Sequence, residues 1–236
     1  MSTTDSDNII KVLDHGYVRM LGSLGSDIDV VNAARVSYDK EVEEFSDKDL
    51  SLLSFLIKHK HDSTLRHCAI SFEIYAPLMV ARQWYKHTVA SSHLDDQLGW
   101  NESSRRYITE EPTFYLPEQW RLAPENKKQG SAGYTSPELS RKITERLSWH
   151  IKESEGLYNH MMSLGVAPEQ ARLFLPAYSM YVRWRWTASL NALLHFLSLR
   201  NADDAQSEIR DYAEVIGGMV KGIFPQTVKA WEEYRG

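Results

Sequence analysis

The sequence predicts a single α+β domain, because segments with strand spacing and segments with helix spacing follow one another without a regular alternation. Its 236 residues suit one large domain, and its 42% hydrophobic and 25% charged residues are typical of globular proteins. We find no internal repeat and no low-complexity linker in the sequence. Residues 1–236 are therefore expected to form one mixed domain with a sizeable core.

The first half of the chain contains two predicted strand regions and two predicted helices. Apolar runs at 9–13 and 17–21, with a turn between them, indicate a hairpin. The Ser46–Asp49 capping box begins a helix, since apolar residues recur behind it at helical spacing. Residues 69–75 alternate apolar and polar side chains, which predicts a strand with one buried face. Residues 77–87 suit a helix with proline in its first turn.

The middle of the chain is predicted to be loops and helices. Val89–Trp100 and 122–135 are rich in serine, aspartate, glycine or proline, which is typical of loops. Residues 136–165 predict a long helix, with an apolar stripe that begins at Leu139. A short helix is expected between two prolines, within 168–176.

The last part of the chain predicts one strand and two helices. Residues 180–186 alternate apolar side chains with arginines, which indicates a strand with one apolar and one basic face. Leucines at i, i+3, i+4 and i+7, counted from Leu190, predict a helix after this strand. A last helix is expected from about Asp204 to Ile223, where Pro225 breaks it.

Charge and cysteine content exclude several classes of protein. The net charge of −5 argues against a general nucleic-acid binder, which would be basic. A single cysteine, Cys68, permits no internal disulfide and fits a reducing compartment. Residues 1–8 lack the pattern of a secretory signal, and no apolar run approaches the roughly 20 residues that cross a bilayer. We expect a cytoplasmic protein with no membrane and no nucleic-acid partner.

Two clusters carry groups that suit a nucleotide. Residues 101–107 combine two arginines, two serines, an asparagine and a glutamate, and guanidinium forks beside hydroxyls match phosphate oxygens. Residues 82–87 place two cations and a glutamine on one helix, and a glutamine amide can read a base edge. Taken alone, the first cluster also fits a solvated loop, and the second fits a helix end whose dipole favours cations.

A third cluster contains His59, His61, His67 and Cys68. Its spacing fits no familiar zinc site, because a second cysteine pair is missing, so no metal is expected. We expect His61 to be a polar site residue. Cys68 opens an apolar strand, which favours a small buried residue over a nucleophile.

A fourth group spans Arg172–Gln206. Ser189, Ala192 and His195 follow one another at roughly one-turn steps, so the serine and the histidine can share a helix face while the leucines enter the core. The alternative for His195 is a satisfied, half-buried histidine. The alternative for Arg183 and Arg185 is a solvated strand face.

Together these segments resemble the flavin-dependent thymidylate synthases. The landmarks follow that family's order and are residues 33–38, 61–67, 81–87, 101–107, 171–176, 186–190, 195–200 and 204–206. Three departures occur. The family's Arg-His-Arg run is Lys86-His87-Thr88 here, residues 89–100 lengthen the link to Asn101, and Arg66 stands where many relatives have an acidic residue.

The resemblance implies a homotetramer of α+β subunits that methylates deoxyuridine monophosphate (dUMP) to thymidylate (dTMP). In such proteins methylenetetrahydrofolate supplies the carbon, NADPH reduces bound FAD, and the flavin supplies the hydride. The resemblance also implies active sites that are shared between subunits.

Site residues are implied position by position. Arg200 matches an arginine that contacts the uracil base, and His61 matches a histidine near the flavin ring, so both are predicted catalytic residues. The predicted dUMP-binding residues are Gln83, Lys86, Glu102, Ser103, Ser104, Arg105, Arg106, Arg172 and Arg200. The predicted FAD-binding residues are Ser37, Ser63, Lys86, His87, Thr88, Asn101, Glu102, Ser189, Asn191 and His195.

Two other classes remain open from the residues alone. A single-stranded nucleic-acid binder would use the tryptophans and arginines of strand 180–186, although strand spacing sets them on opposite faces. A metal-dependent hydrolase would use the histidines near His61 together with Glu102. The absence of a Gly-x-Gly-x-x-Gly fingerprint disfavours a Rossmann dehydrogenase.

Overall fold

The computed structural model describes residues 9–85, 87, 100–103, 111–124 and 131–235. Its strands are β1 (Ile9–Val12), β2 (Gly16–Leu24), β3 (Ala69–Pro77), β4 (Trp100–Glu102) and β5 (Tyr181–Ser189). Its helices are α1 (Asp27–Arg35), α2 (Asp47–Lys58), α3 (Leu78–Trp84), α4 (Pro137–Ser163), α5 (Pro168–Ala171), α6 (Leu190–Arg200), α7 (Ser207–Ile223) and α8 (Pro225–Arg235). Three 3-10 turns are η1 (Val36–Tyr38), η2 (Thr64–His67) and η3 (Arg172–Phe174).

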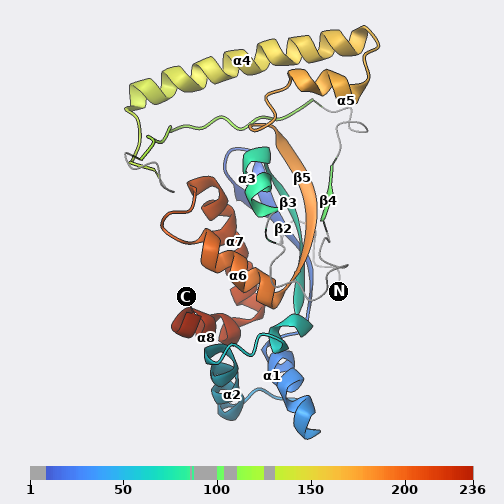
Figure 1. Ribbon diagram of the computed structural model, residues 1–236, viewed down its shortest axis with the longest axis vertical. Helices are drawn as coiled ribbons and strands as arrows, with labels where there is room; N and C mark the ends of the chain where they lie inside the picture. Colours follow the sequence, from blue (N-terminus) through green and yellow to red (C-terminus); the bar gives the residue numbers. More distant parts are fainter. Residues whose placement is uncertain (1–8, 86, 88–99, 104–110, 125–130, 236) are drawn as a thin grey trace.

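The strands form one sheet in the order β1-β2-β3-β5-β4, and each neighbouring pair is antiparallel. Helices α6 and α7 lie beside the sheet, while the long α4 crosses its upper end (Figure 1). The predicted hairpin and both predicted internal strands are confirmed, with β2, β3 and β5 extending beyond the expected ranges. The mixed α+β class is therefore confirmed.

The core face of the sheet follows the predicted alternation. In the register of β3 with β5, Phe72 pairs with Trp186 and Ile74 pairs with Trp184, and all four side chains are buried. The opposite face is polar, as the arginines of β5 predicted. Glu73 on this face is only 9% exposed, because its carboxylate accepts a hydrogen bond from a tyrosine of β2 and pairs with an arginine of that strand. The alternation of β3 alone would place the Glu73 carboxylate in solvent, but its partners on β2 allow it to be buried.

Aromatic packing fixes α3 against α6. The Trp84 ring stacks on Phe196 at 4.6 Å and meets Trp184 and Trp186 edge-on at 5.5 and 5.4 Å. Helix α3 ends at Trp84, three residues before the predicted end, since the His87 N–H donates to the Trp84 carbonyl in a tight turn. This turn carries His87 towards α6.

The predicted stripe of α4, at Leu139, Ile143 and Leu147, is half-buried at Ile143 and Leu147 but exposed at its first residue. Leu139 is 47% exposed, whereas Ser140, Ile151, Ser154 and Tyr158 are buried. Ser140 can be buried because its hydroxyl is hydrogen-bonded to the segment around Trp120, which crosses α4. The Ser140 hydroxyl accepts the N–H of Trp120 at 3.2 Å. Backbone groups of this segment therefore decide which side of α4 is covered.

The C-terminal helix α8 was not predicted. Pro225 was expected to end the last helix, but it also begins α8, since proline is favoured in a first helical turn. Val228 and Trp231 of α8 are buried against the rest of the domain. Helix α7 begins at Ser207, three residues later than expected. Among the described residues, no helix is long and apolar enough to span a membrane.

Candidate active site

The end of α3 and the last turn of α6 bring two predicted site residues into contact. The Arg200 Nε–H donates to Nε2 of His87 at 2.8 Å. The His87 ring lies edge-on to Phe196 at 5.1 Å, and the His195 ring centre is 6.4 Å away. Because Nε2 accepts this hydrogen bond, His87 is neutral and carries its proton on Nδ1. A predicted flavin-side histidine thus holds the predicted catalytic arginine.

Burial and neighbouring charge keep His87 neutral. Burial, and then the nearness of Arg200 and His195, lower the pKa of His87 to about 4. Partial burial also lowers the pKa of Arg200. A guanidinium stays protonated near neutral pH even so, because its ordinary pKa exceeds about 12. Arg200 therefore stays positively charged, and the neutral His87 ring stays able to accept its Nε–H hydrogen bond.

Acid is expected to destabilise the protein through His87 between about pH 6.5 and 4. An unfolded histidine takes up its proton near pH 6.5, whereas the folded pKa of His87 is about 4. The unfolded state binds more protons in this window, so the free energy of unfolding falls as the pH falls. His87→Gln, which does not titrate, should show a shallower loss of urea midpoint between about pH 7 and 4.5. Equal slopes for the two proteins would exclude His87 as the cause.

Gln83 lies one turn before His87 and contacts the segment that precedes α7. Its amide nitrogen donates to Oε1 of Gln206 at 2.8 Å and to the carbonyl of Met79 at 3.2 Å. Gln206 belongs to one of the landmark runs but was not a predicted site residue. Local sequence spacing could not predict that Gln206 contacts Gln83, because the two residues are 123 positions apart.

Strand β4 brings the Asn-Glu-Ser run to the edge of the sheet. Asn101 and Glu102 are exposed there and pair with β5. The Ser103 N–H donates to the Arg183 carbonyl at 2.7 Å, and its hydroxyl accepts the Arg183 N–H at 3.1 Å. The predicted loop at Val89–Trp100 lies outside the described residues except for Trp100, which begins β4. Predicted site residues outside the described part of the chain are Lys86, Thr88, Ser104, Arg105 and Arg106.

A cavity of about 350 Å³ lies between α3 and β4. It is lined by Leu78, Ala81, Arg82, Tyr85, Glu102 and Tyr178. A guanidinium and a carboxylate therefore reach one small cleft from two elements. Arg82 was noted as a cation of the α3 cluster but not as a site residue, and only the approach of β4 reveals its place beside Glu102.

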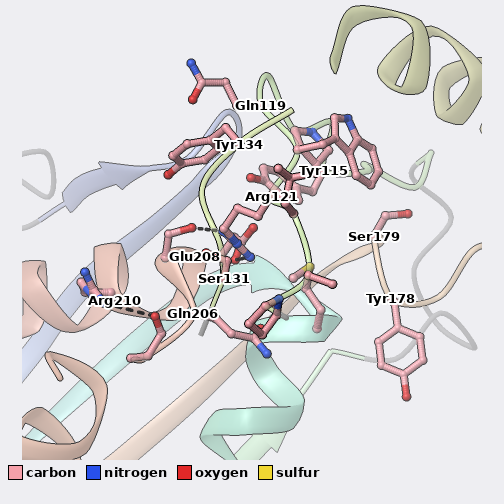
Figure 2. Close-up of a pocket in the computed structure, with 18 of the residues that line it drawn as sticks. Tyr115, Gln119, Arg121, Ser131, Tyr134, Tyr178, Ser179, Gln206, Glu208 and Arg210 are labelled. Atoms are coloured by element: carbon pink, nitrogen blue, oxygen red, sulfur yellow. Dashed lines mark hydrogen bonds and ion pairs between the residues drawn. The ribbon is translucent and has the colours of Figure 1, made fainter. Parts of the chain in front are cut away.

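A larger cavity of about 1080 Å³ shares Tyr178 with the small one (Figure 2). Arg121 reaches into it and pairs with Glu208 at 2.6 Å. Arg210 donates to the carbonyls that precede α7, including that of Ala202 at 2.9 Å. Arg121 and Arg210 have partners within the chain, and the rest of the lining mixes apolar side chains with aromatic, hydroxyl, amide and carboxylate groups. No sequence pattern predicted it, because its walls come from segments far apart in the chain.

Other predicted flavin-side residues lie near η2. His61 and Ser63 are exposed there, and the His61 ring is 5.7 Å from the Phe55 ring. Ser37 is exposed on η1, at the end of α1, and α1 packs on η2. The Leu190 N–H donates to the carbonyl of the residue that follows η2, which joins the start of α6 to this region.

Two predicted flavin-side residues of α6 have roles in the fold. The Ser189 hydroxyl caps the helix by accepting the Ala192 N–H at 3.2 Å. Asn191 is only 3% exposed, in the first turn of α6. His195 is half-buried, which agrees with the structural alternative for this residue and leaves part of its ring accessible.

The exposed groups around η2 fit a flavin dinucleotide. Tyr38 is 79% exposed and Phe55 is 51% exposed, so flat apolar surfaces lie beside the serine hydroxyls and His61. A flavin carries ring systems that favour aromatic surfaces and polar edges that favour hydroxyl and imidazole partners. The donor set is therefore suitable for FAD.

Arg172 lies apart from Arg200 in the single chain. It is exposed at the start of η3, which packs on α4 and α5, whereas α6 packs on α7, β5 and η2. The fold thus joins His87, His195 and Arg200, with Gln83 one turn before His87, but does not bring Arg172 to them.

Cys68 is expected to be dispensable for chemistry. It is fully buried, and burial raises the pKa of its thiol to about 12, so it is not a ready nucleophile. Cys68→Ala should cost about 1–2 kcal/mol of stability through lost packing and should keep turnover. Loss of activity in a folded, flavin-bound variant would show that the thiol reacts.

The geometry of β5 removes support from the nucleic-acid alternative. Trp184 and Trp186 are 1% and 7% exposed, so neither ring can stack on a nucleic-acid base. In the described part of the chain, no group of three or more histidine, cysteine, aspartate or glutamate side chains could hold a metal ion.

A mixed α+β fold with an arginine hydrogen-bonded to a histidine at a helix junction, and a glutamine one turn away, is typical of an enzyme site for a small polar ligand. A family profile described as "Thymidylate synthase complementing protein" matches residues 19–226. The flavin-dependent thymidylate synthase of Thermosipho melanesiensis is 36% identical over 228 residues, covering 96% of this chain and 95% of its own. That of Thermus thermophilus is 37% identical over 225 residues, covering 95% of this chain and 78% of its own.

A solved structure gives the same result. The UMP/dUMP methylase PolB from Streptomyces cacaoi, bound to 5-bromo-dUMP, superposes with a TM-score of 0.80 at 27% identity. The match covers 95% of this chain and 98% of that one. The chain therefore belongs to the flavin-dependent thymidylate synthase family. It is a flavin-dependent methyltransferase.

Proposed function

We propose that the protein converts dUMP to dTMP with methylenetetrahydrofolate as carbon donor and NADPH as reductant of bound FAD. The balanced reaction is dUMP + methylenetetrahydrofolate + NADPH + H⁺ → dTMP + tetrahydrofolate + NADP⁺. The observation that carries the proposal is the Arg200–His87 hydrogen bond, which presents a fixed cation at the junction of α3 and α6. Family membership over nearly the whole chain supports the same reaction.

The nucleotide is proposed to bind beside α3, between the last turn of α6 and strand β4. Gln83 and Arg200 contribute an amide and a guanidinium, and Glu102 and Ser103 approach on β4. The proposed dUMP-binding residues are Gln83, Lys86, Glu102, Ser103, Ser104, Arg105, Arg106, Arg172 and Arg200. Guanidinium forks suit the phosphate because they match its oxygens in pairs.

FAD is proposed to bind along η2 and the facing ends of α1 and α6. When bound, FAD supplies the hydride that reduces the transferred methylene group to methyl. The residues proposed to hold it are Ser37, Ser63, Lys86, His87, Thr88, Asn101, Glu102, Ser189, Asn191 and His195, with His61 near its ring. His87 carries its proton on Nδ1, so it can donate to a flavin acceptor while Nε2 accepts from Arg200.

We propose that four copies assemble and complete one another's sites. Arg172 is separate from Arg200 in one chain, because η3 packs on α4 and α5 whereas α6 packs on α7, β5 and η2, so a site that uses both arginines needs a second subunit. Apolar side chains available for such contacts include Trp149 on α4, 50% exposed, and Leu173 on η3, 82% exposed. Large exposed apolar side chains on neighbouring elements are typical of subunit interfaces.

The test is an absorption spectrum of the purified protein followed by a dTMP-formation assay. A flavin spectrum and dTMP that depends on both methylenetetrahydrofolate and NADPH are the expected results. Bound zinc without flavin, together with hydrolysis in place of methylation, would instead establish the metal-dependent hydrolase. Light scattering tests the tetramer separately, so a dimeric mass would overturn the assembly alone.

A further inference from the structure

The amide nitrogen of Gln83 is hydrogen-bonded to two acceptors of the same chain. One N–H donates to Oε1 of Gln206 at 2.8 Å, and the same nitrogen donates to the Met79 carbonyl at 3.2 Å. A primary amide has two N–H donors and one oxygen acceptor. With the nitrogen held by these two acceptors, the side chain presents its oxygen to a ligand.

Hydrogen bonds within the chain fix the backbone at Gln206. It is the N-cap residue of α7, and its carbonyl accepts the Arg210 N–H at 3.1 Å. The Arg210 guanidinium donates to the carbonyls of Ala202 and Ala205 at 2.9 and 3.2 Å. Figure 2 shows Gln206 at the foot of the large cavity, which Met79 also lines. The residue that provides the acceptor for Gln83 therefore belongs to a segment whose backbone is fixed by hydrogen bonds.

We propose that Gln206 is a positioning residue that orients the Gln83 amide so that its oxygen faces the nucleotide. This inference rests on the proposed function, because it takes dUMP as the ligand of Gln83. An amide oxygen accepts an N–H or O–H hydrogen, such as those of the uracil ring and the sugar, and does not pair with a group that only accepts. Without Gln206, the amide could rotate and present its NH₂ group equally well.

Replacing Gln206 by methionine tests the orientation, because methionine keeps the length of the side chain and loses the acceptor. In Gln206→Met, the KM for dUMP should rise about tenfold while kcat stays within about twofold. Gln206→Glu keeps an oxygen acceptor, and a carboxylate is favoured at a helix N-terminus. This variant should keep the KM for dUMP within about threefold of the wild-type value.

A double-mutant cycle separates positioning from a merely structural effect. If Gln206 acts through Gln83, then adding Gln206→Met to Gln83→Met should change the KM for dUMP by less than about twofold. Gln119 is an exposed glutamine of the large cavity's lining (Figure 2), and the proposal gives it no part in holding Gln83, so Gln119→Met is a matched control that should leave KM unchanged. Full additivity in the cycle, or a wild-type KM in Gln206→Met, would overturn the inference.

Calorimetric binding of dUMP to the wild-type protein distinguishes failure of the proposed function from failure of the role proposed for Gln206. If the wild-type protein does not bind dUMP, the proposed function is wrong. If it binds dUMP and forms dTMP while the Gln206 variants behave as the wild type, only the role of Gln206 is wrong. Urea midpoints of all variants identify any that fail to fold.

Discussion

Arg200→Ala is expected to lower dTMP formation on the order of a hundredfold or more while the protein still folds and binds FAD. For the uracil ring to act as a carbon nucleophile, its N–H must lose a proton or become strongly polarised. Arg200 cannot take that proton near neutral pH, because its own pKa exceeds about 12. It can stabilise the anion that forms, and partial burial strengthens this interaction.

The geometry explains why one arginine can have so large an effect. His87 holds the Nε–H of Arg200, so the N–H groups on the two terminal nitrogens remain to be offered to the uracil. A held guanidinium needs little reorganisation when negative charge develops. Arg200→Lys should therefore recover only part of the rate, since an ammonium lacks the planar fork.

Two measurements check this prediction. Steady-state dTMP formation should fall strongly in Arg200→Ala, whereas reduction of bound FAD by NADPH should change far less, because that half-reaction needs no ionised uracil. Arg141 on α4 is exposed and weakly paired with Glu145 at 3.9 Å, so Arg141→Ala is the control for losing a surface arginine. A near wild-type rate in Arg200→Ala would assign the role elsewhere, with Arg172 the next candidate.

Asp27→Ala is expected to destabilise the fold by about 3 kcal/mol through the start of α8. Asp27 lies in the first turn of α1 and is only 7% exposed. Its carboxylate accepts the N–H groups of Gln226 and Thr227 at 2.9 Å each and the Thr227 hydroxyl at 2.6 Å. Alanine would leave these donors, two of them at a helix N-terminus, without their acceptor.

Asp29 provides the matched control on the same helix. Within the described part of the chain, its carboxylate accepts local bonds alone, from the N–H and hydroxyl of Ser26. Asp29→Ala should cost about 1 kcal/mol, the usual effect of losing a helix cap. Urea unfolding measures both variants, and hydrogen exchange should show faster exchange in α8 for Asp27→Ala only. Equal losses of stability would mean that Asp27 does not anchor α8.

Periodicity predicted the internal faces of the sheet and of α6 correctly. Residues two apart in a strand, or three and four apart in a helix, share a side, so a local pattern is enough to identify the buried face. The same reasoning was wrong for Leu139, because the covered side of α4 is set by the hydrogen-bonding needs of a separate segment. It also missed α8, whose start is capped by a residue 200 positions earlier.

The sequence by itself determined the α+β class, the buried faces of β3, β5 and α6, and, through its ordered motifs, the flavin-dependent thymidylate synthase family. Only the tertiary structure decided which polar groups meet. Arg200 contacts His87 across 113 positions, and Gln83 contacts Gln206 across 123. Such pairs depend on how α3, α6 and α7 pack around Trp84, because packing and not local spacing sets the distance between separate helices.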